Sequence, residues 1–174
     1  MDKFELARIK YKPKNIKYLL VAETPPKSDS NRFFYFEIVD KQDSLFLETM
    51  KLFYPEDTNS IGTKEIRKRK KEFLSKFRFD GFYLIDSLND PFEKRYRSSE
   101  KVKLIKLGQV QLLQRIKNLL SPNTKVILIT SPVFKANNEF LKSHGVPVIN
   151  IESIDFPGSG GQKKFREKMK RILN

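Results

Sequence analysis

A carboxylate stands where an apolar, strand-like segment ends and a stiff loop begins. Glu23 directly follows the apolar residues 18–22 and precedes Pro25 and Pro26, whose fixed φ angles limit the freedom of the loop. A carboxylate held in this way can act as a general base or hold a water molecule against a substrate. The structural alternative is that Glu23 caps backbone N–H groups or pairs with Arg32.

A second strand-like segment, residues 81–85, leads into Asp86 and then Asn89. Asp86 can orient a substrate or a water molecule, or it can cap the segment that follows. The side-chain amide of Asn89 both donates and accepts hydrogen bonds, so it can contact the edge of a base. The same Asn-Asp-Pro sequence also suits a turn without any ligand. We take Glu23 and Asp86 as candidate catalytic residues and Asn89 as a candidate base-binding residue.

Three consecutive aromatic residues, Phe33, Phe34 and Tyr35, lie downstream of the double proline. An aromatic ring offers a face on which a nucleobase can stack, a contact worth roughly 1–3 kcal/mol per base. Consecutive aromatic residues also occur in strands and cores, and we expect at least one of the three to be a core residue. Phe34 and Tyr35 are the candidates for stacking on a base.

A glycine-rich turn precedes the last predicted helix, residues 162–173. Backbone N–H groups in such a turn and the positive end of the helix dipole favour an anion such as phosphate. Two lysines open the helix, where their charge opposes the dipole unless an anion lies nearby. The serine of the turn is alternatively a simple helix N-cap. The candidate phosphate-binding residues are Gly158, Ser159, Gly160, Gly161, Lys163 and Lys164.

The chain carries an excess of positive charge that suits a polyanionic partner. It has 35 Lys and Arg against 21 Asp and Glu, which gives a formal net charge of +14. The densest cationic run lies in a predicted helix over residues 64–77, whose apolar residues fall roughly on one side. A solvated helix face is the ordinary interpretation of such a run, and a track for a phosphate backbone is the alternative. We expect a nucleic acid as the partner, DNA rather than RNA.

Four apolar segments without polar alternation position these residues. Segments of this kind indicate strands that are covered on both faces, as in a parallel sheet between helices. Helical patterns alternate with them, which predicts one three-layer α/β/α domain over residues 1–174, with a central four-stranded parallel sheet. The predicted strands are 18–22, 81–85, 126–129 and 146–151, and the predicted helices are 43–53, 64–77, 102–120, 133–143 and 162–173. Ligands of such sheets bind at the carboxyl ends of the strands, where the candidate residues stand.

The composition excludes several kinds of site. There is no cysteine, and the only histidine is His144, so thiolate and multi-histidine metal sites are ruled out. We expect no metal and no cofactor. No run approaches the roughly 18 apolar residues that span a bilayer, and the first residues lack the apolar centre of a signal peptide. A cytoplasmic protein without a membrane partner is expected, with a monomer as the default.

Two short motifs, in their order and spacing, resemble those of the uracil-DNA glycosylase superfamily. Residues 22–26 (Ala-Glu-Thr-Pro-Pro) resemble the family's loop after the first strand, which has the form G-Q-D-P-Y or G-E-x-P-G. Residues 156–160 (Phe-Pro-Gly-Ser-Gly) resemble its late loop of the form H-P-S-P, which leads to the final helix. Residues 84–89 resemble the strand end that places an asparagine or a similar group against the base.

The resemblance implies a four-stranded parallel sheet between helices and a base-sized pocket at the strand ends. It places Glu23 on the acidic motif of this family of DNA-repair hydrolases, Phe34 or Tyr35 near the base-stacking aromatic, and the late loop on the DNA-backbone clamp. Phe156 stands where many members carry a histidine that stabilises the departing base. Thr24 stands where one branch carries a water-positioning aspartate. Losing both groups would remove much of the stabilisation of a developing oxyanion.

Three hypotheses follow for the function. The first is a divergent uracil-DNA glycosylase-like protein that binds a nucleobase or nucleotide in DNA or RNA and could hydrolyse an N-glycosidic bond. In that case Glu23 handles the water, Asp86 or Asn89 contacts the base, and the glycine turn holds phosphate. The second is a non-catalytic nucleic-acid-binding module on the same scaffold. The third is an enzyme that acts on a free nucleotide or a phosphorylated sugar.

Overall fold

Three parallel strands form the centre of the computed structural model, which describes all residues 1–174. β1 (Tyr18–Ala22) lies between β2 (Phe82–Asp86) and β3 (Lys125–Leu128). Leu20 of β1 faces Leu84 of β2 and Ile127 of β3, so the three carboxyl ends meet at one edge of the sheet. Nearly all residues of the three strands are buried, which explains why the strands are apolar without polar alternation.

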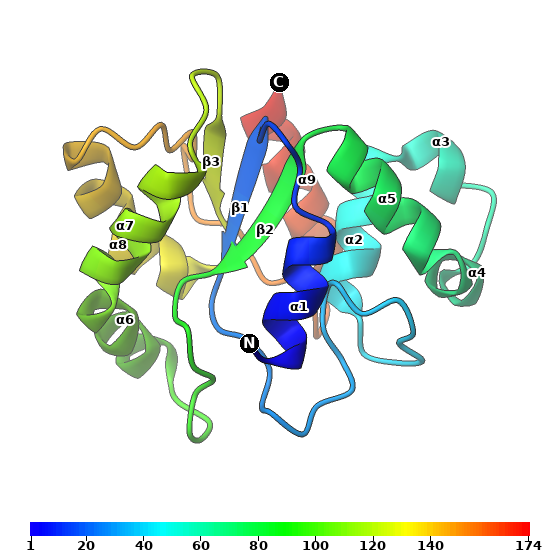
Figure 1. Ribbon diagram of the computed structural model, residues 1–174, viewed down its shortest axis with the longest axis horizontal. Coiled ribbons are helices and arrows are strands. Elements are labelled where there is room, and N and C mark those ends of the chain that lie inside the picture. The colour runs from blue at the N-terminus through cyan, green and yellow to red at the C-terminus, as the bar shows by residue number, and fades with distance from the viewer.

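Helices cover the sheet on two sides and give the predicted α/β layers (Figure 1). On one side lie α6 (Ser98–Leu107), α7 (Gln109–Leu119) and α8 (Ser131–Ser143). On the other side lie α2 (Ser44–Phe53), α5 (Lys70–Phe79) and α9 (Gln162–Leu173). The short helices α3 (Pro55–Thr58) and α4 (Thr63–Lys68) connect α2 to α5. No helix combines the length and the apolar character that a membrane-spanning segment needs.

The four-stranded sheet predicted from the sequence is wrong in its strand count. Residues 146–151 run beside β3 but form a single parallel bridge, between Val126 and Val148. The N–H of Val126 donates to the carbonyl of Pro147, and the N–H of Ile149 donates to the carbonyl of Val126, but Pro147 has no N–H of its own to extend the pairing. The pairing does not continue along β3, because the side chain of Asn150 bonds both backbone groups of Leu128.

Side chains complete the hydrogen bonding of both outer strands. On β3, the side-chain amide of Asn150 accepts from the N–H of Leu128 at 2.7 Å and donates to the carbonyl of Leu128 at 3.0 Å. On β2, the hydroxyl of Tyr35 accepts from the N–H of Leu84 at 2.6 Å and donates to its carbonyl at 2.9 Å. Each side chain thus takes the place of a backbone neighbour at one residue of an edge strand.

Two predicted helices are interrupted, and two others, α1 and the single-turn α3, were not predicted. The expected helix 102–120 breaks at Gly108, where a Cβ atom would lie 2.6 Å from the side chain of Leu88. The expected helix 64–77 breaks at Arg69 into α4 and α5. The N-terminal helix α1 (Lys3–Lys10) gives little apolar signal because Phe4 is its only buried residue, and Asp2 caps it.

Candidate functional site

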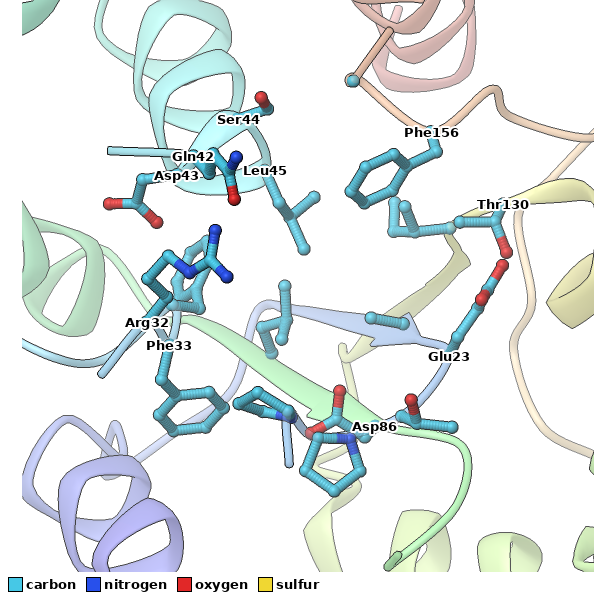
Figure 2. Close-up of a pocket in the computed structure, with 18 of the residues that line it drawn as sticks. Glu23, Arg32, Phe33, Gln42, Asp43, Ser44, Leu45, Asp86, Thr130 and Phe156 are labelled. Atoms are coloured by element: carbon cyan, nitrogen blue, oxygen red, sulfur yellow. The ribbon is translucent and has the colours of Figure 1, made fainter. Parts of the chain in front are cut away.

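A cavity of about 670 Å³ opens at the carboxyl ends of the three strands. This volume lies within the range of roughly 300–1,000 Å³ that is common for ligand pockets. Glu23, Asp86 and Thr130 line it at the ends of β1, β2 and β3 (Figure 2). Segments distant in the sequence supply the remaining wall: 24–26, 30–34, the start of α2 and the turn before α9.

The cavity brings together part of the candidate set from the sequence. Of the candidates, Glu23, Asp86, Phe34, Gly158 and Ser159 line it. The other candidates lie elsewhere. They are Tyr35, Asn89, Gly160, Gly161, Lys163 and Lys164.

The residues outside the cavity have specific reasons for their positions. Tyr35 is a core residue, 1% exposed, whose ring packs among other aromatic rings while its hydroxyl bonds β2. Asn89 is exposed and borders separate hollows that Arg8 and Arg115 also line. Lys163 is exposed and lies 3.8 Å from Glu167 of its own helix, a pairing that offsets part of its unfavourable position at the helix start.

Glu23 is held by a lysine of α6 and not by Arg32. Lys101 Nζ lies 2.9 Å from Glu23 Oε2, and both side chains are partly buried. The carbonyl of Glu23 accepts a hydrogen bond from the N–H of Leu88, which ties the end of β1 to the loop after β2. The carboxylate projects from the strand end toward Thr130 (Figure 2). Its charge is therefore balanced, while only one of its oxygens is used within the chain.

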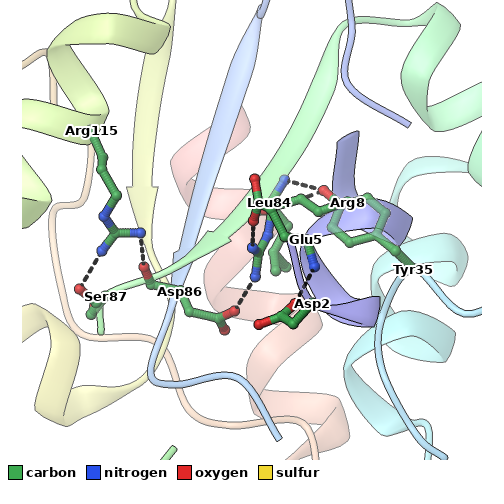
Figure 3. Close-up of polar contacts among 8 residues, drawn as sticks. All are labelled: Asp2, Glu5, Arg8, Tyr35, Leu84, Asp86, Ser87 and Arg115. Carbon is green, nitrogen blue, oxygen red and sulfur yellow. Dashed lines mark hydrogen bonds and ion pairs between the residues drawn. The ribbon is translucent and has the colours of Figure 1, made fainter. Parts of the chain in front are cut away.

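Asp86 is a buried carboxylate between two arginines from different helices (Figure 3). Arg8 Nη2 of α1 lies 2.6 Å from Asp86 Oδ2. Arg115 of α7 donates to the backbone carbonyls of Asp86 and Ser87, at 2.9 and 2.6 Å. Burial raises the pKa of Asp86 to about 6, and the nearby Arg8 charge opposes that rise.

Neither arginine was among the candidates predicted from the sequence. Arg8 comes from a helix that was not predicted, and Arg115 comes from the polar face of a helix in the opposite layer. Arg8 also pairs with Glu5 one turn earlier, and its guanidinium lies 5.4 Å from the ring centre of Phe33. Only the tertiary arrangement brings these groups to one strand end.

Aromatic rings form part of the cavity wall. Phe34 lines it with a small exposed fraction, because the ring packs against Phe46 and Phe77. Phe156 in contrast is 54% exposed and presents its ring to the cavity (Figure 2). The glycine turn folds tightly around it, since a Cβ at Gly158 would lie 2.7 Å from the Phe156 ring. The turn therefore serves first to position Phe156.

A buried ion pair fixes the wall that carries Phe33 and Phe34. Lys70 Nζ lies 2.6 Å from Asp43 Oδ2 and donates to the carbonyl of Phe33 at 3.0 Å. Burial lowers the pKa of Lys70 and raises that of Asp43, while each charge stabilises the other. The pair joins α5 to the start of α2 and to the aromatic segment.

Arg32 is a cation of the cavity wall that makes no ion pair within the chain. Its guanidinium points into the hollow toward Gln42, two residues before α2 begins (Figure 2). An unpaired guanidinium beside a helix N-terminus suits an oxyanion such as a phosphate. The anion-binding potential of the cavity thus rests on Arg32 more than on the lysines of α9.

Backbone strain is concentrated at the cavity. Three residues other than glycine have a positive φ: Gln42 (53°), Thr130 (81°) and Ser159 (49°). All three line the cavity, although they come from three different loops. Strained residues cluster at ligand and catalytic sites, where the surrounding structure maintains them. This clustering supports the choice of the cavity as the candidate site independently of any motif.

No three histidine, cysteine, aspartate or glutamate side chains gather in the manner of a metal site. No protein-family model matches the chain. No curated protein matches it either. The functional argument therefore rests on the cavity and on the chemistry of the residues that line it.

Proposed function

We propose that the chain is a divergent uracil-DNA glycosylase-like protein that binds a nucleobase of DNA in the strand-end cavity and hydrolyses its N-glycosidic bond. The observation that supports this most is the meeting of two distant segments. Residues 23–26 and the late turn around Phe156 line one cavity, as the resemblance requires. The order β2-β1-β3, with residues 146–151 beside β3, is compatible with the sheet that the resemblance implies.

The proposed ligand is a base turned out of the nucleic acid stack. A cavity of about 670 Å³ has room for a base with its sugar, and the exposed ring of Phe156 offers a stacking face. Asp86 at the end of β2 accepts hydrogen bonds from N–H groups of the base when its carboxylate is ionised. Arg32 at the rim pairs with a backbone phosphate.

Glu23 is the proposed general base. It takes a proton from a water molecule while the water oxygen forms a bond to the sugar carbon C1′. The bond between C1′ and the base nitrogen breaks, its electron pair stays on the base, and the base then takes up a proton from solvent. The ion pair with Lys101 orients Glu23, and the second carboxylate oxygen remains available to the water.

A second candidate function, nucleic-acid binding without catalysis, has its own supporting observation. Phe156 places an apolar ring where a hydrogen-bond donor would stabilise the departing base. A protein of this kind would hold an extruded base in the cavity without breaking the bond.

Base release separates the two functions. Fluorescein-labelled single- and double-stranded oligonucleotides, each with one uracil, hypoxanthine or alkylated base, are incubated with protein and then cleaved at abasic sites by alkali. We expect cleavage by the wild-type protein and a loss of at least about 100-fold in Glu23→Gln, the range of general-base catalysis. Glu167→Gln, on the exposed face of α9, is the matched control and retains full activity.

Binding measured on the same oligonucleotides completes the test. No base release together with tight binding that survives Glu23→Gln would favour the non-catalytic module. Tight binding of a free nucleotide with little dependence on salt, and no binding of DNA, would instead favour a small-molecule enzyme. Either result rejects the glycosylase proposal.

A further inference from the structure

Thr130 is the most strained residue of the cavity wall. It joins β3 to α8 with φ 81° and ψ 150°, a backbone region that is almost restricted to glycine. A β-branched side chain makes this conformation still less favourable. The hydrogen bond from Ile129 N to Val21 O on one side, and that from Phe134 N to Thr130 O on the other, hold the conformation in place.

The hydroxyl of Thr130 is buried without a partner. The residue is 3% exposed, and Oγ1 forms no hydrogen bond within the chain. An unpaired buried hydroxyl destabilises the folded state, so it calls for an explanation. Thr130 lines the cavity, and its side chain is directed toward the carboxylate of Glu23 (Figure 2).

The register of the sheet explains why these two groups face each other. Val21 of β1 is paired with Leu128 of β3. Glu23 and Thr130 each stand two residues beyond this pair, on neighbouring strands, and therefore leave the sheet side by side. The unusual φ of Thr130 turns its side chain toward this shared position.

We propose that Thr130 is a ligand-binding residue that holds one hydroxyl oxygen together with Glu23. The Thr130 hydroxyl donates a hydrogen bond to that oxygen, and Glu23 accepts one from it. The inference rests on the proposed function, in which the bound oxygen belongs to the attacking water. The strain is then retained because relieving it with glycine would remove the hydroxyl.

Three variants separate strain from chemistry. Thr130→Gly relieves the strain and removes the hydroxyl, Thr130→Val removes only the hydroxyl, and Thr130→Ser keeps the hydroxyl. The probe is a fluorescein-labelled single-stranded oligodeoxynucleotide with one uracil or one hypoxanthine, used for both binding and base release. Thermal unfolding is followed on the same samples.

We expect Thr130→Gly to raise Tm by about 2–6 °C, because it removes one strained residue from a chain of this size. Base release falls about 10-fold or more in both Thr130→Gly and Thr130→Val, which is the value of one hydrogen bond. Thr130→Ser stays within about 3-fold of the wild-type rate. A residue with a purely structural role would not lose activity while the fold gains stability.

The outcomes that contradict the inference are distinct from failure of the proposed function. Full activity in Thr130→Val overturns this inference and leaves the glycosylase proposal intact. A lower Tm in Thr130→Gly shows that the residue is not strained and also overturns it. If the wild-type protein neither binds nor cleaves any oligonucleotide, the proposed function fails and the inference fails with it.

Discussion

At the scale of single residues, Asp86 is the group whose charge state depends most directly on the fold. It is buried at the end of β2, with Arg8 on its carboxylate and Arg115 on its backbone. Removal from water disfavours the ionised carboxylate more than the arginine stabilises it, and the pKa rises to about 6. The unfolded chain ionises Asp86 near its ordinary value of 3.8.

This difference predicts a specific dependence of stability on pH. Between about pH 4 and pH 6 the folded protein keeps a proton on Asp86 that the unfolded chain has released. The free energy of unfolding therefore falls as the pH rises through this window, by about 3 kcal/mol for a difference of roughly two pKa units. In Asp86→Asn this contribution is absent.

Urea unfolding of the wild type and of Asp86→Asn at several values between pH 4 and pH 7 tests the prediction. The difference between the two free energies of unfolding isolates Asp86 from the other carboxylates. We expect the wild type to lose its advantage as the pH rises. A difference that grows with pH would mean that Arg8 outweighs burial and that the pKa is lowered.

At the scale of elements, the two outer strands depend on side chains for part of their hydrogen bonding. Tyr35 serves the N–H and the carbonyl of Leu84, and Asn150 serves those of Leu128. Both backbone residues are buried, so their polar groups have no access to water as a replacement. The side chains are thus part of the sheet.

Deleting the Tyr35 hydroxyl therefore lowers the free energy of unfolding by more than the loss of one ordinary hydrogen bond does. We expect Tyr35→Phe to lower the free energy of unfolding by about 2–4 kcal/mol, since two buried backbone groups lose their partner. Tyr18→Phe is the matched control, because the Tyr18 hydroxyl forms no hydrogen bond within the chain, and its effect stays within about 0.5 kcal/mol. Urea unfolding measures both. Equal stability of Tyr35→Phe and wild type would contradict the assignment.

Local patterns predicted the elements better than the contacts between them. The apolar run 18–22 is β1 with its predicted bounds, because burial on both faces leaves a continuous signal. Tyr35 was taken for a stacking residue, since sequence cannot distinguish a ring that faces a ligand from one that faces the core. Arg8 reaches Asp86 across 78 positions of the sequence, a contact that no local pattern encodes. Glu23 was found because strand ends are visible in sequence.

At the scale of the whole molecule, the net charge of +14 and the position of the cavity act together. The cavity occupies the end of the sheet where the strands stop, and Arg32 lies at its wall. Lys125 begins β3 and so stands at the opposite end of the strands. A nucleic acid that enters the cavity passes Arg32 and not Lys125.

The position of the cavity at one end of the strands predicts that removing the charge of Arg32 and removing that of Lys125 affect oligonucleotide binding differently. Affinity for a single-stranded oligonucleotide falls as salt rises, and each neutralised phosphate contributes about 0.7 to the slope of log K against log salt. We expect Arg32→Ala to weaken binding and to reduce the slope by about that amount. Lys125→Ala removes one charge as well and leaves the slope nearly unchanged. Fluorescence anisotropy between about 50 and 200 mM salt measures both, and equal slopes for the two variants would place the contact elsewhere.

The side chains on the two outer strands also bear on how copies of the chain behave at high concentration. A bare edge strand is a template on which a segment of another molecule adds as a further strand, the first step toward fibrils. Tyr35 and Asn150 occupy backbone groups that such a strand would have to bond. By occupying these groups, Tyr35 and Asn150 prevent strands of other molecules from adding to the sheet at these positions. Their loss would first be visible as aggregation of protein that is still largely folded.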